Sequence, residues 1–492
     1  MKIVIVGGGI AGLTTYLALQ KHLPRPPAPA ADHEYRIYEP YNTPHNSSSD
    51  EQPQSTTHSS TLTVGGGLGV GPNGLHVLHR LNEDLLHDIV RSGYIVDHSN
   101  LKSKHGHLLL RLPTSGTGGQ QTQHEPMHML AISRHALWSS LRRAVPDSVL
   151  TTKRVSHIAT DASSQNLISF TDNSNPEPAD LVIGADGLKS TVKHALLPDT
   201  EPQCDAHAPH YEGLVGVGGF LTPPKTVRNL IEPGSMNFLF SGNGFFGYFW
   251  AESAPADPQR DSPSHVAQPG DTLAWWATYA IDPCPSDAEL KRMDPDTLTA
   301  RLRERYSGWS DPVVCALLQG IRVQSVWPTW TAAPLASWAR DSIILVGDAA
   351  HALPSTSGQG ASQALEDAEA LGLLLRGFLE RGYQGLEVED GGGEIVGVGA
   401  VERRAVMLAG REYDAMRRPR VEAILRRARR MQDSKRDMGV VREYIMYVGL
   451  WVMGFFPGVF ERGLDEAYEY DLPGHVERVL EESSGFGGCG EA

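Results

Sequence analysis

Short apolar runs that end at glycine or proline dominate the first forty residues of the chain. The run Ile3–Val6 stops at a cluster of glycines, and the residues that follow suit a helix to about Lys21. A brief apolar run bounded by glycine is typical of a buried strand. The segment Pro24–Ala31 cannot continue a helix because proline lacks the backbone N–H, and Tyr35–Tyr38 then predicts a second strand. The pattern therefore predicts a strand–turn–helix–strand unit.

Helical periodicity returns farther along the chain. A helix is expected from near Pro72, because Leu75, Leu78 and Leu81 recur at the spacing of one helix face. Residues 132–144 also have a helical pattern.

The pattern changes twice in the second half of the chain. Residues 167–183 predict a hairpin that feeds a buried strand, whereas residues 205–335 mix aromatic residues with short β-like runs and long loops. This change predicts a separate sheet-based lobe. An α/β pattern returns with the strand Ser342–Val346 and a long helix from about Gly358. Arginines at helical spacing over residues 402–436 predict a solvated basic helix face.

Composition and charge narrow the class of protein. The chain has 492 residues, which is enough for two or three lobes. Its formal net charge of −15 argues against a general nucleic-acid binder, because phosphate binding needs a basic surface. Its 4 cysteines are widely spaced and form no C-x-x-C pair. A disulfide framework or a metal site is therefore not expected, and a reducing, cytoplasmic location is favoured.

The first glycine cluster has the form G-x-G-x-x-G between a predicted strand and a predicted helix. Gly7 permits the tight turn, Gly9 lets the backbone approach a pyrophosphate, and Gly12, after Ala11, lets the helix pack closely on the strand. The start of the helix offers free N–H groups to phosphates. Glu39 ends the second strand, where an acidic residue accepts hydrogen bonds from a ribose. The alternative is that Glu39 is a surface carboxylate.

Two further strand ends carry glycine and aspartate. One apolar strand closes at Asp186-Gly187, where the aspartate would bind a ligand or simply tie the turn. Another ends at Gly347-Asp348, and a second glycine-rich turn, Gly358–Gly360, then opens the long helix. We expect all three strand ends to converge on a single dinucleotide.

These three segments, in this order, resemble the fingerprints of the class A flavoprotein monooxygenases, the family of para-hydroxybenzoate and salicylate hydroxylases. They frame residues 1–370. The similarity extends to about residue 430, through Tyr413, Arg417, Arg418 and Arg420.

The resemblance implies roles for particular residues. Asp348 would bind the ribityl or pyrophosphate part of FAD, the alternative being a helix N-cap or turn residue. Gly360 and Ala361 would place N–H groups on the flavin pyrimidine edge. Arg134 would lie against the pyrophosphate, the alternative being a surface helix charge, and Gly71 belongs to a segment near the flavin ring.

Other residues support the same cofactor. In the family, the segment with Asp186 and Gly187 is thought to serve both FAD and the nicotinamide donor. Reduced flavin is an anion, so a helix start near Gly358 would stabilise it, and Pro354 could wall the ring. We expect His351 to be structural.

The resemblance also implies an α/β fold: a Rossmann-like FAD-binding domain of the glutathione-reductase βαβ type, with an inserted mixed β-sheet substrate domain and C-terminal helices. The expected divisions are the first part of the FAD-binding domain at 1–200 with a low-complexity insertion at about 43–60, the substrate-binding domain at 201–335, the second part of the FAD-binding domain at 336–430, and a helical extension and tail at 431–492.

The implied activity is hydroxylation or epoxidation of a small organic substrate, aromatic or secondary-metabolite-like, by NAD(P)H and O₂ through a flavin C4a-hydroperoxide. The segment 211–219 is rich in glycine where the family often has a substrate-side arginine or tryptophan. We therefore assign no catalytic base. Aromatic residues at strand spacing are more often core than pocket residues, and on that basis the pocket candidates are Tyr211, Tyr248, Trp275 and Trp276.

Three questions stay open at this stage. The same fold could serve a flavin-dependent dehydrogenase, oxidase or halogenase, or a binding protein like the Rab GDP-dissociation inhibitors. The uncharged stretch Tyr444–Phe460 predicts a buried or interfacial helix, with peripheral membrane contact as the alternative to burial. The chain could be a monomer or a homodimer.

Overall fold

The computed structural model describes most of the chain. The described residues are 1–41, 66–116, 125–160, 165–196, 208–281, 284, 286, 289, 294–388, 397–432, 437–456 and 465–483. The low-complexity insertion expected at about 43–60 lies outside them.

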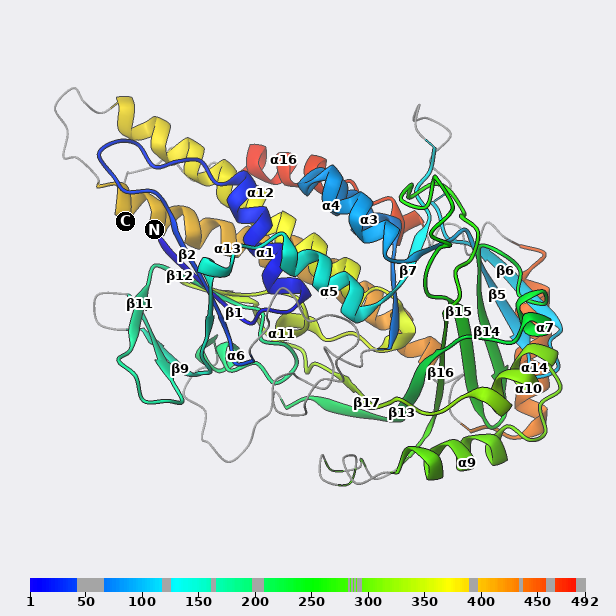
Figure 1. Ribbon diagram of the computed structural model, residues 1–492. Helices are drawn as coiled ribbons and strands as arrows, with labels where there is room; N and C mark the ends of the chain where they lie inside the picture. Colours follow the sequence, from blue (N-terminus) through cyan, green and yellow to red (C-terminus); the bar gives the residue numbers. More distant parts are fainter. Residues whose placement is uncertain are drawn as a thin grey trace.

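A six-stranded sheet forms the centre of one lobe, which we call the parallel-sheet lobe (Figure 1). Its strands, in spatial order, are β18 (Ala339–Arg340), β19 (Ile343–Leu345), β12 (Leu181–Gly184), β1 (Lys2–Val6), β2 (Glu34–Glu39) and β8 (Leu150–Thr152). All neighbouring pairs are parallel except β18–β19. The apolar residues of β1 and β12 are buried, as expected for parallel strands covered on both faces.

The helices of this lobe pack around the sheet and against one another. They are α1 (Ile10–His22), α3 (Pro72–Leu81), α4 (Glu83–Arg91), α5 (Arg134–Arg143), α12 (Gly360–Val388), α13 (Val398–Gln432) and α16 (Leu472–Glu482). Helix α12 packs along both α1 and α13. The helix expected near Pro72 is confirmed, with Leu75, Leu78 and Leu81 buried.

Smaller elements complete this lobe. One three-stranded sheet has the order β3 (Gly67–Val70), β7 (Met129–Ser133), β4 (Tyr94–Val96), and another has the order β11 (Glu177–Ala179), β10 (Asn166–Phe170), β9 (Val155–Thr160). The short helices are α6 (Val192–Leu196), α11 (Asp348–His351), η2 (Asp147–Val149) and η3 (Ser355–Ser357).

The other lobe, the seven-stranded lobe, is a mixed sheet beside the first. Its strands, in spatial order, are β17 (Ser325–Thr331), β13 (His210–Leu221), β16 (Leu273–Ala280), β15 (Gly244–Trp250), β14 (Ser235–Ser241), β5 (His98–Ser103) and β6 (Leu108–Pro113). The pair β14–β5 is parallel and the other pairs are antiparallel. Its helices are α7 (Lys225–Arg228), α9 (Pro295–Arg305), α10 (Pro312–Gly320) and α14 (Val440–Met453). Strands β5 and β6 come from early in the chain, so two distant segments build this sheet.

Two expectations from the sequence need correction. The arginines of α13 do not all lie on a solvated face, because Arg417 is fully buried among carboxylates of α12. The apolar stretch expected to form a buried or interfacial helix is in α14, and its outer side is not buried: Tyr444 and Ile445 are 52% and 66% exposed. Burial of two other α14 residues, Glu443 and Tyr447, accounts for its attachment.

Among the helices within the described ranges, none combines the length and the apolar character that crossing a bilayer would require.

Candidate functional site

The three glycine-punctuated strand ends lie side by side. Strands β1, β12 and β19 are parallel neighbours, with Val6 opposite Gly184 and Gly184 opposite Leu345. Their carboxyl ends therefore meet at one edge of the sheet, which is where open α/β sheets bind ligands. The convergence of the strand ends expected from the sequence is confirmed.

The glycines of the first turn divide into two kinds. A Cβ atom on Gly7, whose φ is +109°, would overlap the carbonyl of Ala185, and a Cβ on Gly12 would overlap the carbonyl of Gly7. These two glycines allow neighbouring backbone segments to pack in direct contact. A Cβ on Gly9 would meet no atom within 4 Å. Gly9, two residues before Ala11, thus borders open space that a ligand can enter.

Glu39 is held against this turn rather than free on the surface. Its Oε2 accepts a hydrogen bond from the Gly8 N–H at 2.7 Å, and its Oε1 accepts one from the Tyr41 N–H at 3.2 Å. Burial raises the pKa of Glu39, and these two hydrogen bonds oppose that rise. A carboxylate has about four acceptor positions, so Glu39 retains capacity for a ligand hydroxyl.

Asp186 ties the turn after β12 with one of its oxygens. Its Oδ2 accepts from the N–H groups of Thr191 and Val192, at 2.6 and 3.3 Å. Its Oδ1 is buried and has no partner among the described residues. Burial raises the pKa of this carboxyl. The next residue, Gly187, has φ +79° and borders open space. A buried polar atom without a partner, beside open space, fits a site for a polar ligand.

The third strand end contacts the first turn directly. A Cβ on Gly347 would lie 2.8 Å from the Cβ of Ala11. The Gly347 N–H donates to Asp367 Oδ2 at 2.9 Å. Asp348 is exposed and is the first residue of α11. The N-cap position of this helix is Gly347, which has no side chain to form a capping hydrogen bond. The expected alternative, a helix cap, therefore does not describe Asp348.

The start of α12 faces the same region. Gly358 is left-handed at φ +60°, and a Cβ placed on it or on Gly360 would meet no atom within 4 Å. The first N–H groups of a helix, here those of Gly360 and Ala361, have no intrahelical acceptor and carry partial positive charge. Pro354 is buried just before, at the cap of η3. This helix start is therefore open to an anionic partner.

Gly71 joins the start of α12 from the side. It caps α3, and its N–H donates to Ser362 Oγ at 3.0 Å. A Cβ on Gly71 would lie 3.1 Å from Gln359 Nε2 and 3.0 Å from the ring of Tyr468. The contact with Tyr468, in the C-terminal segment, could not be anticipated from the sequence.

Arg134 lies on the face of α5 that contacts the first glycine turn. Trp138, one helical turn later, donates from its Nε1 to the carbonyl of Gly8 at 2.9 Å. Residues four apart share a helix face, so Arg134 lies on the same side. Its Nε is buried and has no partner among the described residues. A buried, unpaired guanidinium nitrogen is suited to a phosphate.

A buried ionic network behind these turns was missed by sequence reasoning. Arg417 donates to Asp367 Oδ1 at 2.9 Å, to Glu366 Oε2 at 2.5 Å and to Gln363 Oε1 at 2.7 Å. Asp367 in turn accepts from Gly347 and contacts His351 Nε2 at 2.5 Å. His351 is therefore structural, as expected. Burial alone would raise the pKa of Asp367, but His351 and Arg417 together hold it below its usual range.

The same network reaches α3. Asn73 donates to Glu366 Oε1 at 2.5 Å and to Gln359 Oε1 at 3.1 Å. Arg420 also donates to Glu366, at 2.8 Å. The hydrogen-bonded network thus fixes the starts of α3 and α12 and the turn at Gly347 relative to one another. The sequence gives one signal of this network: the pair Glu366-Asp367 lies on α12, and the next helix, α13, carries a cluster of arginines.

The glycines of β13 have a specific use in the seven-stranded lobe. A Cβ on Gly216 would overlap the indole of Trp327, and one on Gly218 would lie 2.9 Å from it. On β15, a Cβ on Gly247 would overlap the indole of Trp276. These positions lack side chains so that two indoles can lie flat across one sheet face.

Of the pocket candidates, only Trp276 lies on this face. Trp275, the residue before Trp276, and Tyr248, which pairs with Trp275, point to the opposite face of the sheet. They are 2% and 0% exposed. They belong to the core under α9 and α10. Tyr211 packs on Trp330 and donates to the carbonyl of Ile281 at 2.8 Å.

Strand β3 connects the indole face to the glycine turns. Gly66 and Gly67, at its start, lie against Trp327 and Phe249, and Gly71, just after its end, lies against the start of α12. The end of β17 is also tied to the third turn, where the Ala332 N–H donates to the Ala352 carbonyl at 3.2 Å. The aromatic face and the three turns therefore border one region between the lobes.

Comparison with known proteins agrees with this geometry. Residues 148–386 match the family model described as FAD binding domain. The 6-hydroxynicotinate 3-monooxygenase of Bordetella bronchiseptica is 27% identical over 325 residues, which is 65% of this chain and 74% of that protein. The 6-methylsalicylate 1-monooxygenase of Aspergillus terreus is 24% identical over 393 residues, 76% of this chain and 75% of that protein.

Solved structures share the fold at low sequence identity. A salicylate hydroxylase substrate complex superposes with a TM-score of 0.67 at 19% identity, covering 98% of each chain. Klebsiella pneumoniae HpxO, complexed with FAD and uric acid, gives 0.66 at 19% identity, covering 96% of this chain and 98% of its own. The chain therefore has an FAD-binding domain and the fold of flavoprotein hydroxylases, and it is similar in sequence to FAD-dependent monooxygenases.

Proposed function

We propose that the protein uses NAD(P)H and O₂ to hydroxylate or epoxidise a small aromatic substrate held against the indole face of the seven-stranded lobe. The observation that carries this proposal is the pair Trp327 and Trp276, laid flat over glycines beside the three turns. Flat indoles offer apolar area and a π face to a planar ring. The names of relatives support an aromatic substrate, since two act by name on 6-hydroxynicotinate and 6-methylsalicylate.

The residues around the turns suit the parts of FAD. Gly9 and the N-terminus of α1 would receive the pyrophosphate, together with Arg134. Glu39 would accept hydrogen bonds from the adenosine ribose, and Asp348 would bind the ribityl or pyrophosphate part of FAD.

The other turn residues would serve the flavin ring and its donor. The start of α12, at Gly358 to Ala361, would stabilise negative charge on the pyrimidine edge, a contact worth on the order of 1 kcal/mol. Pro354 and Gly71 would wall the ring, and Asp186 with Gly187 would support FAD and the nicotinamide. When bound, FAD supplies the transfer of two electrons from NAD(P)H to O₂.

The overall reaction balances without a metal. Substrate, O₂, NAD(P)H and a proton give hydroxylated or epoxidised product, NAD(P)⁺ and water. The task of the protein's own residues is to hold the substrate ring in place and to exclude water with Trp327, Trp276 and Phe249, which favours coupled turnover over release of H₂O₂.

The test is substrate-stimulated oxygen uptake by the FAD-loaded protein, with NADH and NADPH each tried against a panel of hydroxylated aromatic and heteroaromatic acids, phenols and polyketides. Mass spectrometry under ¹⁸O₂ should show one labelled atom in the product. Failure of both reductants to bleach the flavin would overturn the proposal. An unlabelled product would indicate a dehydrogenase, oxidase or halogenase instead.

Adjacent tryptophans of β16 give a matched control for the substrate face. Replacing Trp276→Phe should raise KM about three- to tenfold, because one aromatic contact is worth about 0.5–1.5 kcal/mol. Trp275→Phe, on the opposite face, should leave KM unchanged. Gly216→Val should raise KM as well, by displacing the Trp327 indole. Equal effects at Trp275 and Trp276 would exclude this face as the substrate wall.

A further inference from the structure

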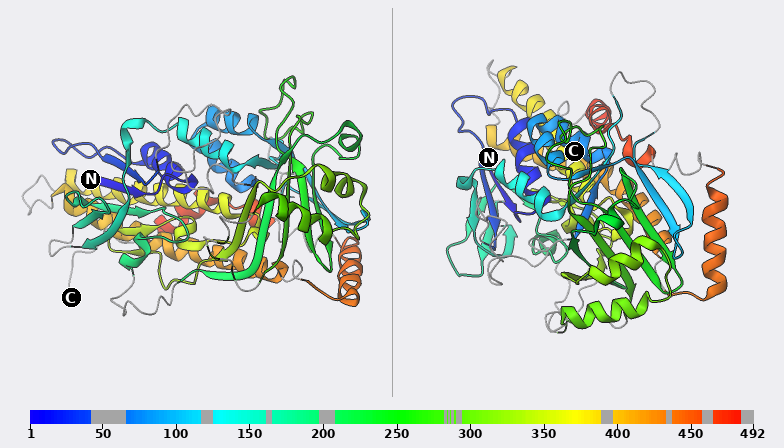
Figure 2. Two further views of the ribbon diagram at one scale, coloured as in Figure 1. Left: turned by 60° about the horizontal axis from the view of Figure 1, so that its bottom comes forward. Right: turned by 45° about the vertical axis from the view of Figure 1, so that its right-hand side comes forward.

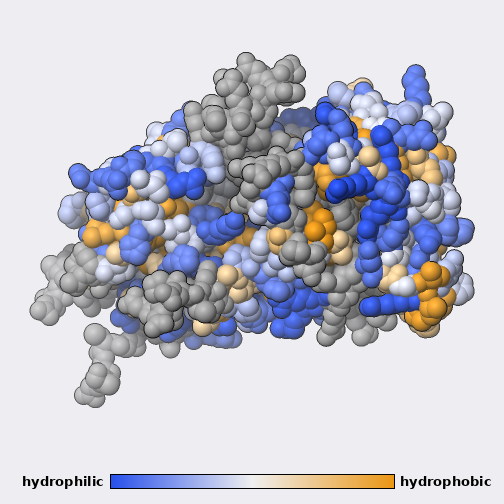
Figure 3. Space-filling model, turned by 90° about the horizontal axis from the view of Figure 1, so that it is seen from below, coloured by the Kyte–Doolittle hydropathy of each residue, from blue (hydrophilic) through white to orange (hydrophobic). Residues whose placement is uncertain are grey.

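Helix α14 presents an unusually apolar outer surface. Ten large apolar side chains of α14 and the turn after it are exposed: Val440, Val441, Tyr444, Ile445, Val448, Trp451, Val452, Met453, Phe455 and Phe456. Figure 2 shows α14 standing at the outer edge of the seven-stranded lobe, and Figure 3 shows a hydrophobic patch at that end of the molecule. We call these ten residues the α14 surface.

The helix is firmly attached by its other side. The Tyr447 hydroxyl lies 2.6 Å from the carbonyl oxygen of Phe240 and 2.7 Å from Glu443 Oε1, and its one proton is shared between these two acceptors. Lys104 pairs with the same carboxylate at 2.9 Å. Tyr447 also packs in a small core with Leu101 and other residues of the sheet. The α14 surface is thus a fixed feature of the fold.

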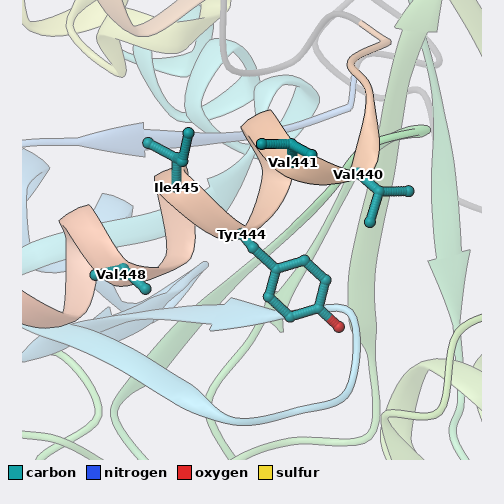
Figure 4. A pocket seen from close by; sticks show the side chains of 5 residues that line it. All are labelled: Val440, Val441, Tyr444, Ile445 and Val448. Atoms are coloured by element: carbon teal, nitrogen blue, oxygen red, sulfur yellow. The ribbon is translucent and has the colours of Figure 1, made fainter.

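The width of the surface decides what could cover it. Viewed down the helix axis, where successive residues are about 100° apart, the exposed apolar positions form an arc of about 140°. The arc runs from Val440 to Ile445, and five other apolar positions lie between these two. Figure 4 shows five of these side chains projecting in different directions from the helix. A coiled-coil seam is a narrower stripe, so one partner helix would leave much of the arc in water. A lipid phase would cover all of it.

The lack of charged residues within the apolar arc and the negative charge of the chain favour neutral over anionic lipids. No acidic or basic residue lies within the apolar arc; Arg442 lies at its margin and Glu443 is turned inward. The whole chain has a formal net charge of −15, which would be repelled by anionic lipids. Tryptophan and other aromatic residues, here Trp451 with Phe455, favour the headgroup boundary.

The length of the helix fixes its orientation. Its 14 residues extend about 21 Å, whereas a bilayer's hydrocarbon core is about 30 Å thick. An amphipathic helix of this kind lies in the interface plane. We propose that the α14 surface docks the protein peripherally on neutral, zwitterionic lipid bilayers, with α14 lying along the headgroup boundary.

The experiment is flotation of the FAD-loaded full chain with phosphatidylcholine vesicles. Most of the protein should float with vesicles, and a salt concentration of about 0.5 M should not release it, because the contact is apolar and salt screens only charges. Ile445→Lys should weaken partitioning at least tenfold, because it replaces an apolar side chain of the buried contact by a charged one. Val441→Lys, at a 75% exposed position, should act similarly.

A control comes from another exposed apolar residue. Met407, 54% exposed on α13, should tolerate Met407→Lys without loss of flotation. Flavin content and the unfolding midpoint report whether each variant is folded. Absence of flotation, or equal loss in the Met407 variant, overturns the proposal. So does a lipid-free dimer in analytical ultracentrifugation that Ile445→Lys dissociates, because a second copy would then cover the α14 surface.

Discussion

Two buried tyrosines, one in each lobe, have opposite surroundings. Tyr413 of α13 donates its hydroxyl to the carbonyl of Leu345 at 3.0 Å, beside the ionic network of Arg417. Tyr248 of β15 is equally buried, but its hydroxyl has no partner among the described residues, and neither do the indole N–H groups of Trp250 and Trp275.

The difference separates two ways of building a site. In the parallel-sheet lobe, directional hydrogen bonds fix the turns that would hold FAD, because a cofactor site needs accurate placement of N–H groups and charges. In the seven-stranded lobe, aromatic packing sets the shape of a face, and shape alone suffices for an apolar ring. We expect the first lobe to be sensitive to loss of polar partners and the second to changes of volume.

The largest effect should come from removing the central cation. Arg417→Met leaves Glu366 and Asp367 buried without it, so the free energy of unfolding should fall by about 3–5 kcal/mol. Urea denaturation followed by circular dichroism measures this. The pair Arg411–Glu412, whose arginine is 66% exposed, provides the control, where Arg411→Met should cost less than about 0.5 kcal/mol. A similar cost at both positions would contradict the distinction.

The glycines of the first turn should separate packing from ligand approach. Gly12→Ala forces a methyl group onto the Gly7 carbonyl, so it should lower the free energy of unfolding by about 1–3 kcal/mol. Gly9→Ala has open space around it and should leave the apoprotein's stability unchanged. FAD titration monitored by flavin fluorescence should nevertheless show at least tenfold weaker binding. Unchanged FAD affinity in the Gly9 variant would remove the proposed pyrophosphate site.

The loss of unfolding free energy caused by Arg417→Met should be smaller at acidic pH. Asp367 has a lowered pKa in the folded protein, so the stability it contributes is present above its unfolded pKa of about 4 and is lost as pH falls below that value. Without Arg417, burial would raise the pKa of these carboxyls, and the variant would bind protons on folding. Its deficit should therefore shrink by about 1–2 kcal/mol between about pH 7 and pH 4. A pH-independent deficit would mean that packing, not charge, dominates.

The smallest effect tests the two tyrosines directly. Tyr413→Phe should reduce the free energy of unfolding by about 1 kcal/mol, because the Leu345 carbonyl loses its donor. Tyr248→Phe removes a hydroxyl without a described partner and should be neutral or slightly stabilising. Thermal denaturation of both variants gives the comparison, and the reverse order would contradict it.

Much of the candidate FAD site was accessible from local sequence. Gly7, Gly12 and the Gly347-Asp348 pair could be assigned because a tight turn after a strand needs glycine whatever surrounds it. The substrate face was not accessible, because a glycine in a strand does not tell which distant side chain fills the space. The reason for a glycine at position 216 is the indole of Trp327, which lies far along the chain. Whether Trp275 or Trp276 faces the substrate could not be decided without the strand register.

Local sequence was enough to specify the strand–turn–helix units, their order and the resemblance that named the cofactor, since backbone constraints and periodicity are encoded over short distances. It could not specify that Arg417 is buried while Ile445 is exposed, against what their polarity suggests. That outcome came from the packing of the folded chain, because burial depends on which surfaces meet. Carboxylates of α12 stabilise the arginine in the interior, and no described element of the fold covers the outer side of α14.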